Sequence, residues 1–184
     1  LKNLPVDVEN EAKLLDEVAD FFAQRAKNML LDKGVRYDVV DAVLAAPGLD
    51  DLADIFVRAD ALAAYLETEK ASDSIQAFTR VENISKNNVV EAPVDAALFQ
   101  DAAEKALSEA VEKVAAATAP LAADRKYADL LAANDELAAP VNAFFDAVMV
   151  MDKDEKVKNN RLALLNQVKK QVNQVADLSQ LVMK

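Results

Sequence analysis

Apolar side chains recur at helical spacing along most of the chain, and this pattern predicts helices from end to end. The strongest run, residues 140–175, predicts a short helix, an acidic turn and a long closing helix. Pro140 suits the first turn of a helix, where a missing N–H costs nothing. Asp152, Asp154 and Glu155 favour the start of the closing helix, because the helix dipole attracts negative charge there. The predicted buried stripe of the closing helix is Leu162, Leu165, Val168, Val172 and Val175.

The first half of the chain predicts one long helix and three shorter ones. The long helix runs from about residue 7 to 33, with Asp7 as its N-cap and Gly34 ending it in a left-handed conformation. Its predicted buried stripe is Leu14, Leu15, Val18, Phe21, Phe22, Met29 and Leu30. The shorter apolar patterns predict helices over residues 38–45, 50–69 and 72–86.

The second half adds a linker and two helices before the closing pair. Residues 87–93 are polar and end in Pro, so we expect a linker there. A long helix is expected to begin at Asp95 and to run to about residue 117, where Pro120 breaks it, and a weaker helix covers about residues 125–138. The whole pattern predicts an all-α bundle of roughly eight helices in a single domain over residues 1–184.

Composition excludes several classes of protein. Among 184 residues there are only 2 Gly and 5 Pro, too few for a β-rich fold with its many turns. With 0 Cys and 0 His, the chain cannot form disulfides, thiolate or histidine metal sites, or a Ser-His-Asp arrangement. No apolar run reaches the roughly 18–20 residues that span a bilayer. The first residue is Leu1 and not Met, so we expect a fragment of a longer protein. Because His, Cys and a Gly-rich phosphate loop are missing, we expect this fragment to be non-catalytic and to have no cofactor or metal of its own.

Four ordered segments resemble a known family. FFDAVMVM followed by NNRLALLNQV, residues 144–168, resembles the closing signature of the α-helical anticodon-binding domain of the DALR type. The similarity is to the version in the beta subunit of bacterial glycyl-tRNA synthetase in particular. Three further segments agree in the same order: FFAQRAKNMLLDKGVRYDVVDAVLA at 21–45, FTRVENI at 78–84 and VDAALFQDAAEKALSEAV at 94–111. This sequence departs from the family at Thr79, where a basic residue usually precedes Arg80.

The resemblance implies a role in tRNA handling. The parent enzyme would join glycine to its tRNA in the cytoplasm, using ATP and Mg, with catalysis in a separate alpha subunit. The domain's implied partner is the anticodon arm of glycine tRNA, and neither DNA nor a membrane is expected as a partner. No catalytic residue carries over to this chain.

Charge both opposes and refines that expectation. The net charge of -11 has the wrong sign for a general RNA binder, because phosphate contacts need Lys and Arg. Residues 156–176, however, contain no Asp or Glu, and residues 74–90 contain one. The residues we expect to contact tRNA are Arg80, Asn83, Lys86, Lys158, Asn160, Arg161 and Lys169. The alternative for each basic residue is a solvated helix face or an ion pair within a helix.

Phe145, Asp146 and Arg161, near the end of the chain, are expected to stabilise the packing of the last two helices. We expect Phe145 to be buried between the last two helices, with stacking on RNA as the alternative. Asp146 and Arg161 are expected to pair and to hold those helices together.

The chain as a whole also has an alternative function, as a helical docking module that joins subunits without touching RNA. RNA binding would weaken steeply with added salt, whereas apolar docking would not.

Overall fold

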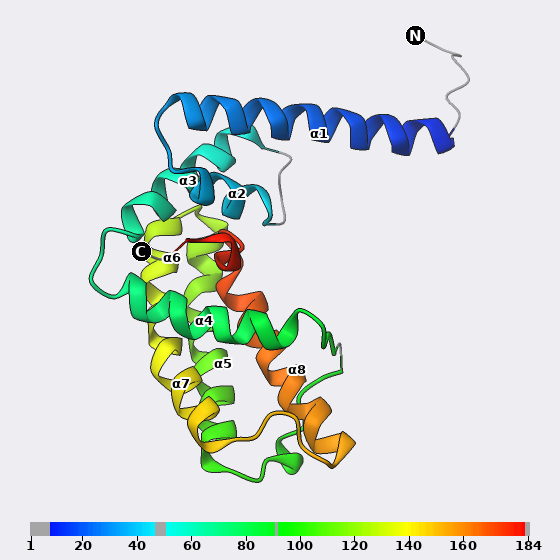
Figure 1. Ribbon diagram of the computed structural model, residues 1–184, viewed down its shortest axis with the longest axis vertical. Coiled ribbons are helices and arrows are strands. Elements are labelled where there is room, and N and C mark those ends of the chain that lie inside the picture. The colour runs from blue at the N-terminus through cyan, green and yellow to red at the C-terminus, as the bar shows by residue number, and fades with distance from the viewer. Residues whose placement is uncertain (1–7, 47–50, 91, 183–184) are drawn as a thin grey trace.

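The computed structural model describes residues 8–46, 51–90 and 92–182 (Figure 1). These residues form helices and loops without any β-strand, which confirms the predicted all-α class. The elements are α1 (Val8–Asp32), α2 (Tyr37–Leu44), α3 (Leu52–Tyr65), α4 (Ala71–Ser85), η1 (Ala96–Leu98), α5 (Ala102–Ala123), α6 (Tyr127–Asn134), η2 (Asp135–Leu137), α7 (Ala138–Ala147), α8 (Glu155–Val172) and η3 (Leu178–Gln180), where η marks a 3-10 helix.

Local sequence signals set several of these boundaries. Asp154 caps α8, and Asp101 and Glu104 form a capping box at the start of α5. Asp51 accepts the N–H groups of the first turn of α3. Gly34 follows α1 with a φ of 83°, the left-handed conformation that glycine adopts without strain. The predicted cap at Asp7 lies outside the described residues.

Two predicted boundaries are wrong. Asp95 caps the short helix η1 and not a long one, and α5 begins only after Asp101. Pro120 does not break α5, because it lies in the last turn of that helix. There its missing N–H removes a single intrahelical bond, a cost that the tertiary packing of the helix offsets.

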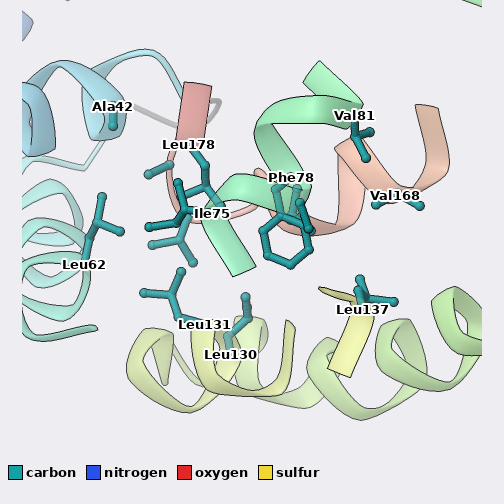
Figure 2. Packing of buried hydrophobic residues seen from close by; sticks show 14 of the residues in the cluster. Ala42, Leu62, Ile75, Phe78, Val81, Leu130, Leu131, Leu137, Val168 and Leu178 are labelled. Carbon is teal, nitrogen blue, oxygen red and sulfur yellow. The ribbon is translucent and has the colours of Figure 1, made fainter. Parts of the chain in front are cut away.

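Helices α5, α6, α7 and α8 form a bundle, and α4 lies across it with its inner face buried (Figure 1). Figure 2 shows Ile75 and Phe78 of α4 pointing into the core, toward side chains from α6, η2 and α8. Phe78 is 1% exposed. The labelled partners from α6, η2 and α8 are Leu130, Leu131, Leu137 and Val168. Helices α2 and α3 close one end of the bundle, and α1 extends from that end (Figure 1).

The predicted burial of the α1 stripe is wrong for most of its length. Leu30 is buried, as expected, together with Ala26. The exposed members of the stripe are Leu14, Val18, Phe21, Phe22 and Met29. Only the last part of α1 packs on α2 and α3, whereas the rest runs beyond the bundle (Figure 1). The side chain of Leu15 lies outside the described residues.

Candidate nucleic-acid interface

The outer face of α4 brings together three of the residues expected to contact tRNA. Arg80, Asn83 and Lys86 follow one another at intervals of one helical turn, and all three are exposed. The opposite face of the same helix carries Phe78 and Val81, which are buried. The apolar period of α4 therefore orients its polar residues to solvent on a rigid element.

Arg80 is held in place without neutralisation by an acid. Its guanidinium carbon lies 4.6 Å from the centroid of the Phe145 ring, and Nη1 donates a hydrogen bond of 3.1 Å to the Asn142 side chain. Both contacts come from α7, so Arg80 links α4 to α7. A cation–π contact leaves the positive charge available, because the ring supplies a quadrupole and not a counter-charge.

Phe145 is consequently not the buried aromatic residue that the sequence predicts. Phe144 is 0% exposed, whereas Phe145 is only partly buried beneath Arg80. Val141, Phe144 and Val148 share the core-facing side of this segment. Adjacent residues on a helix point in directions about 100° apart, so only one of the two Phe side chains can point directly into the core.

Arg161 lies in the interior and is already saturated with partners. Its Nε lies 2.9 Å from a Glu104 carboxylate oxygen, and its Nη1 lies 2.7 Å from an Asp152 oxygen and 3.1 Å from the Met149 carbonyl. Burial opposes the charged form, but the ion pairs outweigh it and raise the pKa of Arg161. The expected pair with Asp146 is wrong, because the carboxylates within ion-pair distance of Arg161 are those of Glu104 and Asp152. A tRNA contact by Arg161 would first require breaking these ion pairs.

Asn160 is also a structural residue. Its side-chain oxygen accepts the Asp95 N–H at 2.7 Å, and its nitrogen donates to the Asp95 carbonyl at 3.0 Å. Asn160 is 5% exposed. This paired contact holds the segment before η1 onto α8, so both groups of the Asn160 amide are already occupied.

Lys158 and Lys169 are paired with acids. Lys158 lies 2.6 Å from Glu155 in the first turn of α8. Lys169 lies 2.8 Å from Glu82 of α4, which also accepts a hydrogen bond from Asn173. The second pair joins α8 to α4. A phosphate would have to compete with a carboxylate for either lysine.

The basic residues that form no ion pair are better candidates for phosphate contact than Lys158, Arg161 and Lys169. Among the described residues, those within or directly flanking α4 and α8 that form no ion pair with Asp or Glu are Lys70, Arg80, Lys86, Lys153, Lys156 and Lys170. The others in the described part of the chain are Arg25 and Lys33, on or beside α1. Basic residues free of internal acids are the ones that can neutralise phosphate without first breaking an ion pair.

The solvent side of α8 contributes Lys156, Asn159, Gln167 and Lys170, all exposed. A hollow of about 410 Å³ on one side of Lys170 is lined by α5 and by Gln167, Gln171 and Gln174. A second hollow of about 390 Å³, on its other side, reaches the residues after α2. The sequence contained the signal for this face, because its polar residues recur at helical spacing opposite the apolar stripe.

The faces of α4 and α8 are neighbours. The Asn166 side chain donates to the carbonyls of Asn88 at 3.3 Å and Val90 at 3.4 Å, so the segment after α4 lies against α8. Lys86 precedes that segment, and Lys170 follows Asn166 by one turn. The outer faces of α4 and α8 thus carry exposed amides and unpaired basic side chains on two helices that are in contact, an arrangement that suits an RNA backbone with unpaired bases.

Two other types of site have no support in the described residues. No cluster of three or more His, Cys, Asp and Glu side chains is arranged there to bind a metal ion. Within the same residues, no helix combines the length and the apolar character that crossing a membrane would require.

Comparison with known proteins finds a family for the region that contains α4 and α8. Residues 74–180, from α4 to η3, match the family model described as the DALR anticodon binding domain. Curated relatives named glycine–tRNA ligase beta subunit include one from Clostridioides difficile, 37% identical over 179 residues, or 97% of this chain and 26% of the relative. Another from Desulforudis audaxviator is 42% identical over 163 residues, which cover 89% of this chain and 23% of that relative. The chain thus spans about a quarter of the length of the curated relatives that it matches.

Proposed function

This chain belongs to the family of DALR anticodon binding domains, and on that premise we propose that it binds the anticodon arm of a tRNA. One observation carries the proposal. The region that matches the family, residues 74–180, contains the two helices whose outer faces hold exposed amides and basic residues without acidic partners. Anticodon loops present a bent phosphate backbone and unstacked bases, which need both kinds of group.

The relatives support a proposal for the identity of the tRNA. Because they are glycine–tRNA ligase beta subunits, the proposed substrate is glycine tRNA, and the domain is proposed to be part of a longer beta subunit. That subunit would work with an alpha subunit in the cytoplasm, where ATP-dependent attachment of glycine occurs. This domain supplies binding and position, and the reacting groups belong elsewhere in the enzyme.

The proposed contact residues are revised from those expected on sequence alone. Arg80, Asn83 and Lys86 remain, whereas Asn160 and Arg161 are replaced by exposed residues of α8. The added residues are Lys156, Asn159 and Lys170. Lysines carry a mobile point charge suited to phosphate. Asn has a planar amide with a donor and an acceptor, and Arg has a planar fork of donors, and both geometries recognise base edges.

Salt screening confines the attraction for phosphate to the basic faces of α4 and α8. The chain carries a net charge of -11, but repulsion from exposed acids farther than a Debye length of about 8–10 Å is largely screened. A basic face on an acidic body would attract a matching phosphate backbone and would repel nucleic acid that approaches elsewhere. Each phosphate that is neutralised adds about 0.7–0.9 to the log–log dependence of affinity on salt, so affinity should still fall clearly as salt is added.

The test is a titration of the chain with an anticodon stem-loop of glycine tRNA at several salt concentrations. Replacing Lys86, Lys156 or Lys170 by Ala removes one phosphate contact, so each variant should flatten the log–log salt dependence by about 0.7–0.9. Asn83→Ala should instead lower discrimination between matched and mismatched loops by about 1–3 kcal/mol. Lys105→Ala is the matched control, because Lys105 is an exposed lysine of α5 that pairs with Glu109.

Two results would contradict the proposal in different ways. If the control variant weakens binding as much as the α4 and α8 variants do, the interface is misplaced. If the parent chain binds no stem-loop even at low salt, the chain functions as a docking module without RNA contact.

A further inference from the structure

Helix α1 carries an apolar stripe that nothing in the described structure covers. The exposed fractions are 58% for Leu14, 42% for Val18, 63% for Phe21, 42% for Phe22 and 45% for Met29. Their spacing along the sequence places them on one side of the helix. Arg25 lies on the same side, and it forms no ion pair with any acid of the described residues.

The domain's own core does not account for this stripe. Ala26 and Leu30, both 0% exposed, are the α1 residues that enter the core, where α1 meets α2 and α3. The earlier turns of α1 run past the end of the bundle (Figure 1). An isolated apolar residue on a surface is ordinary, but several in helical register mark an interaction surface.

The size of the stripe distinguishes between two kinds of occupant. Five half-open side chains of this size expose on the order of 400–500 Å² of apolar surface. Pairing two copies of α1 through this stripe would therefore bury at most about 1,000 Å² in total. A stable complex between separate molecules needs at least that area. Within one polypeptide a smaller interface suffices, because the linked parts meet at a roughly millimolar effective concentration and interdomain contacts start at about 600 Å².

We infer that the apolar stripe of α1 packs against the part of the longer polypeptide that lies outside this domain. This rests on the part of the proposed function that places the domain in a longer beta subunit. The Clostridioides difficile relative aligns with 97% of this chain, which includes α1, yet this alignment covers only 26% of the relative. Helix α1 also precedes residues 74–180, the region that matches the family model. The stripe therefore lies in a part of the chain outside the matched region.

The chemistry of the missing surface follows from the stripe. It must be apolar enough to cover two Phe side chains, and it must offer a carboxylate or carbonyl oxygen to Arg25, because a cation covered without a partner is costly. RNA could offer an oxygen to Arg25 and a base face to a Phe ring, but it has no continuous apolar surface that would also cover Leu14, Val18 and Met29. We therefore assign α1 to protein packing, and the faces of α4 and α8 to the proposed RNA contact.

Thiol labelling of the complete polypeptide that carries this domain tests the inference. Since this chain has 0 Cys, Phe21→Cys places a single thiol of the domain in the stripe. Asp20→Cys is the matched control, an exposed neighbour that points away from the stripe. In the complete polypeptide, without RNA, Phe21→Cys should react about tenfold or more slowly than Asp20→Cys, because labelling would require local opening. Mass spectrometry of the α1 peptide measures each rate.

Equal rates for the two thiols would overturn the inference. Protection that appears only as protein concentration rises would also overturn it, in favour of a second copy, and protection that requires the stem-loop would assign the stripe to RNA. Leu14→Cys provides a second probe of the same stripe if Phe21→Cys lowers the yield of folded protein. The rates for Phe21→Cys and Asp20→Cys are compared without RNA, so they can be interpreted even if the chain binds no stem-loop. The proposed RNA contact and the proposed packing of α1 can therefore be refuted independently.

Discussion

The interior position of Arg161 leads to a prediction about stability. Arg161→Met keeps an apolar stem but removes the charge that Glu104 and Asp152 share. Removing one partner of a buried ion pair costs about 3–5 kcal/mol. Glu104 would still accept the backbone N–H groups of Gln100 at 2.7 Å and Asp101 at 2.8 Å, and Asp152 is partly open to water. The loss should therefore lie near the lower limit, about 3 kcal/mol.

Urea and thermal unfolding followed by circular dichroism measure this loss. For a chain of this size, about 3 kcal/mol corresponds to a fall in Tm of about 6–12 °C. Adding Glu104→Gln to Arg161→Met should recover part of the stability, since the double variant no longer buries an unpaired carboxylate. Affinity for the stem-loop, measured well below both Tm values, should remain that of the parent.

Lys158→Met is the control on the same helix. Lys158 pairs with the exposed Glu155, so its loss should change the free energy of unfolding by no more than about 1 kcal/mol. The reasoning is refuted if Arg161→Met melts within about 2 °C of the parent but loses affinity for the stem-loop. That result would make Arg161 an RNA contact despite its burial.

Two further predictions concern the core and acid stability. Phe144→Ala should lower the free energy of unfolding by about 3–5 kcal/mol, and Phe145→Ala by about half as much, because only the first is fully buried; equal losses in urea unfolding would contradict this. Burial alone would raise the pKa of Asp38, but hydrogen bonds from Arg36 and from the Val182 N–H lower it below the usual value. The folded state therefore gains stability from Asp38 above the unfolded pKa of about 3.9 and loses it as the pH falls through the lower folded pKa. The Tm difference between parent and Asp38→Asn should shrink as the pH falls below about 4, and parallel Tm curves down to low pH would refute the assignment.

The sequence by itself determined the class of fold and the family. Apolar spacing, scarce Gly and the caps at Asp154 and Gly34 are local signals, and each acts within a few residues of the helix end that it sets. Four segments sufficed for the resemblance, which the match to the DALR family over residues 74–180 confirms. The predicted contact residues Arg80, Asn83 and Lys86 could also be placed on one face, since a single helix carries them.

Only the tertiary structure decided which faces meet a neighbour. The periodicity of α1 correctly placed Leu14, Val18 and Phe21 on one side of a helix, but burial requires a partner, and α2 and α3 reach only the last part of α1. The sequence likewise could not choose between Phe144 and Phe145, because both fit the helical period and the rotation of α7 is set by its neighbours.

Contacts between residues distant in sequence also decided which Lys and Arg side chains are free to bind phosphate. Arg161 is buried because Glu104, on another helix, accepts its guanidinium, and Lys169 is occupied because α4 presents Glu82 to it. No local pattern in residues 156–176, which contain no acid, reveals either pair. A helical period fixes which side chains share a face, whereas packing between helices brings together charges from distant parts of the chain and so determines which basic residues remain free to bind phosphate.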